Sequence, residues 1–246
     1  MRSFLVLLAT LGTIAFNWLA AVGRINGVTP EMISNHYPTS ITPAGYAFSI
    51  WSLIYFGLVA FSIYQLLPAN LEKFRPVRSF YILSCALNCA WIYFWHNDQI
   101  VICLAIIAAL WFTLFLINHK LRSPETNTDN WVAKGTFGIY FGWVTAATLV
   151  NFAVMLVHLG VQLSPTANTT LAVALILFAA AVGVFMRVRY RNYFFPLAIA
   201  WALTAIAVKQ SGQTLIVTAA AVGVIASLIA SVSFVMDLSS STRGQR

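Results

Sequence analysis

Hydrophobic residues form eight long runs along the chain, and a short polar or charged segment separates each run from the next. Crossing about 30 Å of hydrocarbon takes about 20 apolar residues in a helix. The runs therefore predict eight transmembrane helices, of which the sixth and seventh are short. The predicted spans are residues 3–23, 47–67, 78–95, 99–118, 135–157, 170–186, 193–209 and 214–236.

Lysine and arginine residues alternate between the predicted connections. Of the 14 Lys and Arg residues, all except Arg24 and Lys209 fall in the two terminal segments and in every second connection. Short basic segments stay on the cytoplasmic side of a membrane. This alternation supports the count of eight helices and predicts that both termini are cytoplasmic.

The composition supports a membrane protein and excludes several other classes. Hydrophobic residues make up 60% of the chain and charged residues only 8%, whereas soluble domains carry about 25% charged residues. The net charge of +8 is spread over the connections, so no basic face for nucleic acid is expected. No Asp, Glu, Lys or Arg lies well inside a predicted span, which argues against an ion-coupled carrier.

The N-terminus leaves one alternative open. A basic residue at position 2, an apolar run and the small residues Ala20 and Ala21 also fit a cleaved signal peptide. Cleavage would leave seven helices with the C-terminus still inside.

We expect a multi-pass protein of a bacterial plasma membrane, with a thylakoid or organelle membrane as the alternative.

Tryptophan is concentrated in the first five predicted helices, where six of the eight residues lie between Trp51 and Trp143. Trp18, Trp95 and Trp131 fall near the ends of runs and fit an interfacial aromatic belt. Trp111 and Trp143 lie too far inside their helices for a belt. A buried indole N–H needs a partner, which indicates a helix interface or a ligand pocket.

A long connection before the second helix predicts a lid. Residues 24–46 are nearly uncharged and contain three prolines, and long ordered loops are often functional. Just after them, Phe48, Trp51 and Tyr55 are spaced three and four apart and form one aromatic stripe. An aromatic pocket under such a loop suits a flat apolar ligand.

Two asparagines lie inside predicted helices, Asn88 in the third and Asn151 in the fifth. An asparagine facing lipid is costly, so both are expected to point at other helices. A structural role and a ligand contact are equally compatible with this pattern.

Three segments resemble one known family. Residues 41–55 (ITPAGYAFSIWSLIY), 86–91 (ALNCAW) and 142–151 (GWVTAATLVN) are similar to the motifs of helices two, three and five in the translocator protein / tryptophan-rich sensory protein (TspO/MBR) family. The order of the three segments matches as well. The segment between Pro43 and Trp51 is one residue shorter than the family pattern, and Ser49 or Ile50 stands where the family has proline.

The resemblance covers residues 1–160, the five-helix unit of that family. It implies that residues 161–246 form a three-helix extension packed in the same membrane bundle. Members of the family bind porphyrins, haem and related tetrapyrroles, some bind cholesterol or benzodiazepine-type drugs, and many are dimers. With Phe48 from the aromatic stripe and Tyr46 in place of a loop-proximal Trp, the implied ligand-binding residues are Tyr46, Phe48, Trp51, Tyr55, Asn88, Trp91, Trp143, Ala147 and Asn151.

No cofactor is required by the residues themselves, and haem, a porphyrin or a chlorophyll-type tetrapyrrole is the group that the resemblance implies. His36, His96 and His158 are the candidates for an axial metal ligand, and all lie on the predicted non-cytoplasmic side. None has metal-ligand spacing, so a surface or interface role is the favoured interpretation. The three cysteines also lack the spacing of a disulfide framework or a zinc site.

The last helices carry small residues at every fourth position, namely Ala219, Gly223, Ser227 and Ser231 in the eighth and Ala179 and Gly183 in the sixth. Such stripes let helices approach closely, within this chain or in a homodimer or larger complex.

Three functions follow from these features. The first is a non-enzymatic protein that binds a tetrapyrrole or similar flat hydrophobic ligand as a sensor, carrier or scavenger. The second is a structural or assembly subunit of a larger membrane complex, with pigment binding as one form of this role. The third is an enzyme that degrades a bound porphyrin. The sequence does not support it, because no acid–base pair or nucleophile–base pair lies inside the predicted spans.

Overall fold

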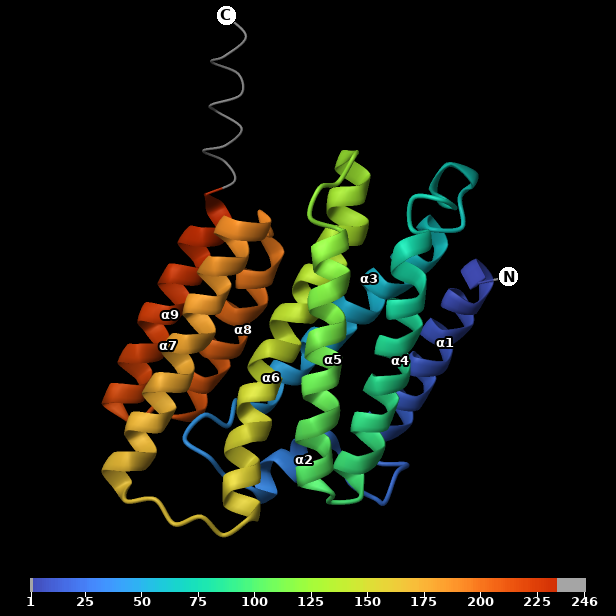
Figure 1. Ribbon diagram of the computed structural model, residues 1–246. Coiled ribbons are helices and arrows are strands. Elements are labelled where there is room, and N and C mark those ends of the chain that lie inside the picture. Colours follow the sequence, from blue (N-terminus) through green and yellow to red (C-terminus); the bar gives the residue numbers. More distant parts are fainter. Residues whose placement is uncertain (1, 234–246) are drawn as a thin grey trace, which may run out of the picture.

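A computed structural model describes residues 2–233, which form one bundle of eight long helices and a short helix at one end (Figure 1). Two 3-10 turns, η1 (Gly45–Ser49) and η2 (Pro68–Asn70), and a π-helical segment, η3 (Asp129–Gly135), occur in the connections. The α-helices are α1 (Arg2–Ala21), α2 (Pro30–His36), α3 (Ile50–Tyr64), α4 (Arg75–His96), α5 (Ile100–Lys120), α6 (Thr136–His158), α7 (Pro165–Tyr190), α8 (Phe194–Lys209) and α9 (Thr214–Val232).

The long helices agree with the eight predicted runs in order and position, and the all-helical membrane class is confirmed. Seven are long and apolar enough to cross a membrane. The eighth, α8, has 16 residues and spans about 24 Å at 1.5 Å per residue, less than the ~30 Å of hydrocarbon. The predicted end of the last helix at residue 236 lies outside the described residues.

The prediction that the sixth helix is short was wrong. Helix α7 has 26 residues and begins at Pro165, before the apolar run. The Ser164 side chain accepts a hydrogen bond from the Ala167 N–H at 3.2 Å, and proline is favoured in the first helical turn. This N-terminal cap extends the helix through polar residues that an apolar count omits.

The helices follow one another across the bundle in a simple order. Helices α1, α4, α5 and α6 lie side by side, and α3 crosses behind them to contact α1 and α6 (Figure 1). Helix α8 packs on α6, and α7 and α9 pack on α8 and on each other. The last three helices therefore continue the same bundle.

The contact between α6 and α8 depends on two glycines four residues apart. A Cβ atom at Gly142 would lie 2.5 Å from the backbone oxygen of Phe195 and 2.9 Å from the Ala198 Cβ. A Cβ at Gly138 would meet the Asn192 side chain. This Gly-x-x-x-Gly pair permits close helix packing in membranes, and its spacing is visible in the sequence.

The small-residue stripe of α9 faces inward. A Cβ at Gly223 would lie 2.6 Å from Leu203 of α8 and 3.3 Å from Ala180 of α7. Ser227 and Ser231 are buried as well. The stripe therefore packs against α7 and α8 of the same chain. The small residues of α9, which also fitted contact with a second subunit, have their packing partners within this chain.

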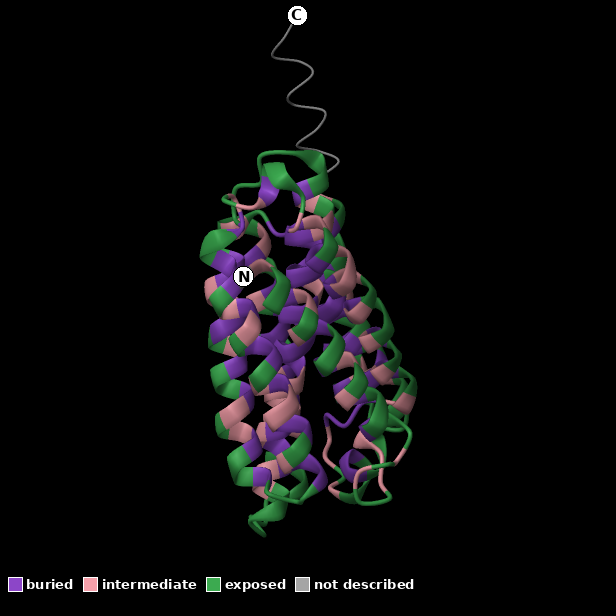
Figure 2. Cartoon of the chain, turned by 90° about the vertical axis from the view of Figure 1, so that its right-hand side faces the viewer, coloured by how far each residue is buried: buried purple, intermediate pink, exposed green. Residues whose placement is uncertain are grey.

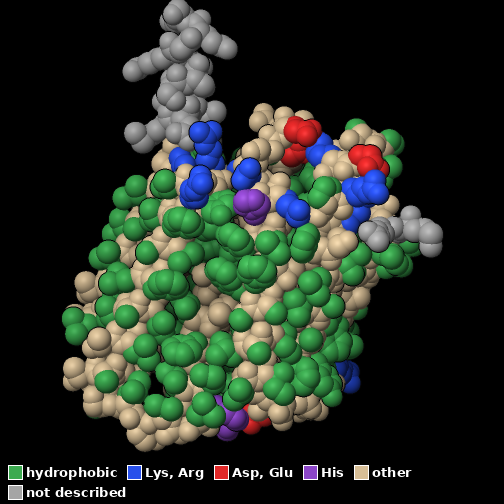
Figure 3. Space-filling model, in the orientation of Figure 1, with side chains coloured by type: hydrophobic (Ala, Val, Ile, Leu, Met, Phe, Trp, Pro, Cys, Tyr) green, Lys and Arg blue, Asp and Glu red, His purple; other side chains and the backbone are tan. Residues whose placement is uncertain are grey.

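Charged side chains gather at one end of the bundle, where α1 begins and α9 ends (Figure 3). Exposed positions along the helices are largely hydrophobic, as expected for a lipid-facing surface (Figures 2 and 3). The predicted separation of basic residues is therefore seen in three dimensions, with Arg24 and Lys209 at the opposite end. Arg243 and Arg246 lie outside the described residues.

Replacement of Gly142 by Ala tests the α6–α8 contact. The added methyl group meets a backbone oxygen that no rotamer change can move, and such overpacking costs about 1–3 kcal/mol. We expect the variant to unfold at lower temperature in detergent than the parent protein.

Gly12→Ala in α1 is the matched control, because no atom lies within 4 Å of its Cβ position. Alanine is favoured over glycine in a helix by up to about 1 kcal/mol. We therefore expect the unfolding temperature of Gly12→Ala to equal or exceed that of the parent protein. Equal unfolding temperatures for Gly142→Ala and Gly12→Ala would contradict the close approach.

Candidate functional site

The segment between α1 and α3, residues 22–49, folds over one end of the bundle and is called the lid below. It contains α2, which the sequence analysis did not predict. The Thr29 side chain caps α2 by accepting a hydrogen bond from the Met32 N–H at 3.2 Å, and Pro30 occupies the first turn. The capping residue and proline are the local signals for this short helix.

The lid is fastened to the start of the α4–α5 turn. The Trp95 indole N–H donates to the Pro30 carbonyl at 3.2 Å, and the Tyr37 hydroxyl donates to the Asp98 carboxylate at 2.7 Å. Burial and the hydrogen bond with Asp98 raise the pKa of Tyr37 to about 12. The hydroxyl therefore remains a donor over the whole physiological range.

Helix α8 fastens the other half of the lid. Four hydrogen bonds join the lid to α8 and to Gln210, the residue that follows it. They are Trp201 Nε1 to Ala47 O at 3.0 Å, Ala44 N to Ala205 O at 2.9 Å, Lys209 Nζ to Asn35 Oδ1 at 3.3 Å, and Gln210 Nε2 to Thr39 O at 3.0 Å.

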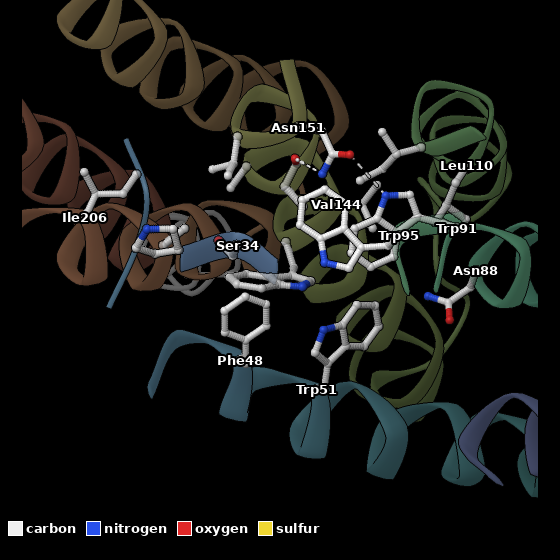
Figure 4. A pocket seen from close by; sticks show the side chains of 17 residues that line it. Ser34, Phe48, Trp51, Asn88, Trp91, Trp95, Leu110, Val144, Asn151 and Ile206 are labelled. Atoms are coloured by element: carbon white, nitrogen blue, oxygen red, sulfur yellow. Dashed lines mark hydrogen bonds between the residues drawn. The ribbon is translucent and has the colours of Figure 1, made fainter. Parts of the chain in front are cut away.

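Beneath the lid lies a cavity of about 50 Å³, called the inner cavity below. Figure 4 shows its lining side chains converging from the lid, α3, α4, α5, α6 and α8. Seven of the nine residues implied by the family resemblance line it, namely Phe48, Trp51, Asn88, Trp91, Trp143, Ala147 and Asn151.

Aromatic rings form one wall of the inner cavity. The ring centroid of Trp143 lies 6.1 Å from that of Phe48 and 6.5 Å from that of Trp51, in edge-to-face arrangements. Trp91 stacks on Trp95 at 5.3 Å. Trp95 is 3% exposed, so its assignment to an interfacial belt was wrong: the lid covers it.

The two asparagines of the cavity already have hydrogen-bond partners. Asn88 accepts from Asn17 Nδ2 at 2.8 Å and donates to the Tyr140 hydroxyl at 3.1 Å. Asn151 accepts from the Trp91 indole at 3.2 Å. Both side chains thus join neighbouring helices, and such intramembrane bonds contribute about 0.6 to 2 kcal/mol each.

A second, larger pocket of about 380 Å³ lies between α1 and α3 and is called the outer groove below. Phe48 and Trp51 line both spaces, so their side chains separate the inner cavity from the outer groove. Tyr55 lines only the outer groove, where it stacks on Trp51 at 5.4 Å.

Tyr46 lies apart from both spaces. It is 42% exposed, and its ring meets the edge of Trp201 at 5.4 Å. The structure therefore places this residue beside α8, on the outer side of η1.

The three candidate histidines line neither space. His36 and His158 are exposed and flank the ring of Tyr37, whereas His96 is buried with Nδ1 2.8 Å from the Ile92 carbonyl oxygen. Among residues 2–233 no three His, Cys, Asp or Glu side chains gather as a metal site. An axial role for one histidine stays a prediction.

Two cavity residues come from the C-terminal helices, which the sequence analysis left without a role. Ala202 and Ile206 of α8 line the inner cavity opposite Asn88 and Trp91. Their sequence carries no signal for this position, because small and branched apolar residues occur throughout α8. Only the packing of α8 on α6 brings them to the site.

Loss of the α8 bonds should loosen the lid. We expect the double variant Lys209→Ala and Gln210→Ala to raise amide hydrogen exchange over residues 30–47 several-fold, since each bond contributes about 0.5–1.5 kcal/mol. Thr204→Ala is the control on α8, because its hydroxyl bonds only to Ala200 of the same helix. Unchanged exchange in the double variant would contradict the fastening.

Comparison with known proteins agrees with the three motifs. A family model described as "TSPO-like protein" matches residues 3–234 and thus includes α7, α8 and α9. Comparisons with curated proteins and with solved structures found no match. Because the family model covers nearly the whole chain, from the lid and aromatic wall to the last helix, the chain belongs to the TSPO-like protein family.

Proposed function

We propose that this chain binds a flat hydrophobic ligand of the tetrapyrrole class beneath the lid and acts as a membrane sensor, carrier or scavenger of it. The observation that carries the proposal is the convergence of seven predicted residues from η1, α3, α4 and α6 on one cavity. They come from three segments that are distant in sequence, and six were selected by the family resemblance and Phe48 by the aromatic stripe.

The size of the site determines how a ligand is held. Pockets for small molecules measure about 300–1,000 Å³, so the inner cavity of about 50 Å³ is a closed form. The outer groove of about 380 Å³ adjoins it across Phe48 and Trp51. Rotation of these two side chains joins the spaces, and a flat ligand then occupies both.

The chemistry of the site favours recognition by stacking and shape. Trp51, Trp91 and Trp143 offer ring faces and edges to an aromatic ligand. Asn88 and Asn151 are engaged in bonds between helices, so polar selectivity is weak. Ligands of similar flat shape are therefore expected to compete for the same site.

Replacement of Trp51 and Trp143 by Ala tests the proposal. Each buried aromatic side chain contributes about 1.5–3 kcal/mol, so the double variant should bind protoporphyrin IX at least tenfold more weakly. Affinity is measured by absorbance titration of the protein in detergent.

Trp131→Ala serves as the control, since this tryptophan is 64% exposed at the charged end and contacts Phe194 instead of the cavity. Its affinity should equal that of the parent protein. Unchanged affinity of the double variant for protoporphyrin IX and haem would refute the proposed site.

A further inference from the structure

The α5–α6 connection separates its charges onto two sides. Its two carboxylates both reach Lys73 of the α3–α4 connection, Asp129 at 2.9 Å and Glu125 at 3.4 Å. The Tyr64 hydroxyl also donates to Asp129 at 3.0 Å. The acidic groups of the connection are thereby held on the side that faces α3 and α4.

The basic residues of the same connection face the other way. Arg122 and Lys134 line a pocket of about 760 Å³ with Arg189 and Arg191 from the end of α7, and it is called the basic pocket below. The other polar residues that line it are His119, Ser123, Asn130, Tyr190 and Tyr193, and no carboxylate of residues 2–233 does so. Figure 3 shows this end of the molecule with its blue side chains around one histidine.

Lys134 is the most deeply placed of these cations. It is 4% exposed, and its ammonium group donates to the backbone oxygen of Arg122 at 3.0 Å. The positive charges of Arg191 and Arg187 repel it. A buried cation is costly unless a negative charge compensates it, and a carbonyl oxygen supplies only a partial one.

The α7–α8 turn holds its cations in a defined position. Arg191 adopts a left-handed conformation with φ of 52° at the end of α7. The next residue, Asn192, is buried, accepts from the N–H groups of Phe194 and Phe195, and donates to Asn118 of α5. The turn is thus bonded to α5, which also carries His119 of the pocket.

We propose that the basic pocket binds a phosphate group. Guanidinium and ammonium donors converge there with no carboxylate from residues 2–233 in the lining, and such groups form strong charge-assisted hydrogen bonds with phosphate oxygens. The pocket lies at the charged end of the bundle, and basic pockets between helices on the cytoplasmic side of a membrane bind anionic lipid headgroups. The phosphate belongs either to such a headgroup or to a soluble phosphate compound.

Binding is tested on the full chain in phospholipid-free detergent, at constant ionic strength adjusted with sodium chloride. One arm titrates inorganic phosphate and the other titrates dihexanoyl phosphatidylglycerol, with dihexanoyl phosphatidylcholine as the zwitterionic reference. The unfolding temperature is followed as a function of ligand concentration. We expect saturable stabilisation in at least one arm.

Variants locate the effect. Lys134→Met removes the buried ammonium group and keeps an unbranched apolar side chain in its place. Arg191→Asn removes the guanidinium group and suits the left-handed backbone at this position, which asparagine tolerates. Their combination should raise the apparent dissociation constant at least tenfold. Arg122→Gln with Arg189→Gln, both at exposed positions, should weaken binding in the same direction without disturbing the buried turn.

Arg75→Gln is the control, because Arg75 pairs with Glu72 in another connection and does not line the pocket. Stabilisation by inorganic phosphate identifies a soluble ligand, and stabilisation by phosphatidylglycerol alone identifies a headgroup. Absence of saturable stabilisation in both arms, or equal binding by the parent and the pocket variants, would overturn the proposal.

Discussion

The close approach of α6 and α8 determines the position of everything that follows α6. At Gly142 the backbone of one helix touches the backbone oxygen of Phe195 in the other, so the two axes cannot move apart or rotate without losing this contact. Because α8 is fixed there, Ala202 and Ile206 reach the inner cavity and Trp201 reaches the lid. A glycine pair near the charged end of the bundle thus sets the geometry at the opposite end, beneath the lid.

The sequence was sufficient for the number and order of the long helices, because apolar length and the alternation of basic residues both report on the membrane. It was insufficient where local bonds decide the structure. Ser164 and Pro165 extend α7 through polar residues, and Thr29 and Pro30 form α2 inside a segment that looks like a loop. Caps act through single hydrogen bonds and leave hydropathy unchanged.

The site was predictable to the extent that motifs marked it. Phe48, Trp51 and Trp143 were selected by spacing and resemblance, and they meet in the structure. Tyr46 and Tyr55 belong to the same motif but lie outside the inner cavity, since Tyr46 lies in η1 beside α8 and Tyr55 lines the outer groove. The residues of α8 were not predictable, since their place depends on a helix contact distant from the site.

The fastening of the lid has a consequence for how the family can vary. Three of the four bonds from α8 to the lid use main-chain atoms of the lid, at Thr39, Ala44 and Ala47. Main-chain bonds persist whatever side chain a position carries, proline at a donor position excepted. Lid side chains that face the cavity, such as Ser34 and Phe48, are therefore open to substitution. The lining of the inner cavity can thus be changed by substitution while these main-chain bonds of the lid are kept.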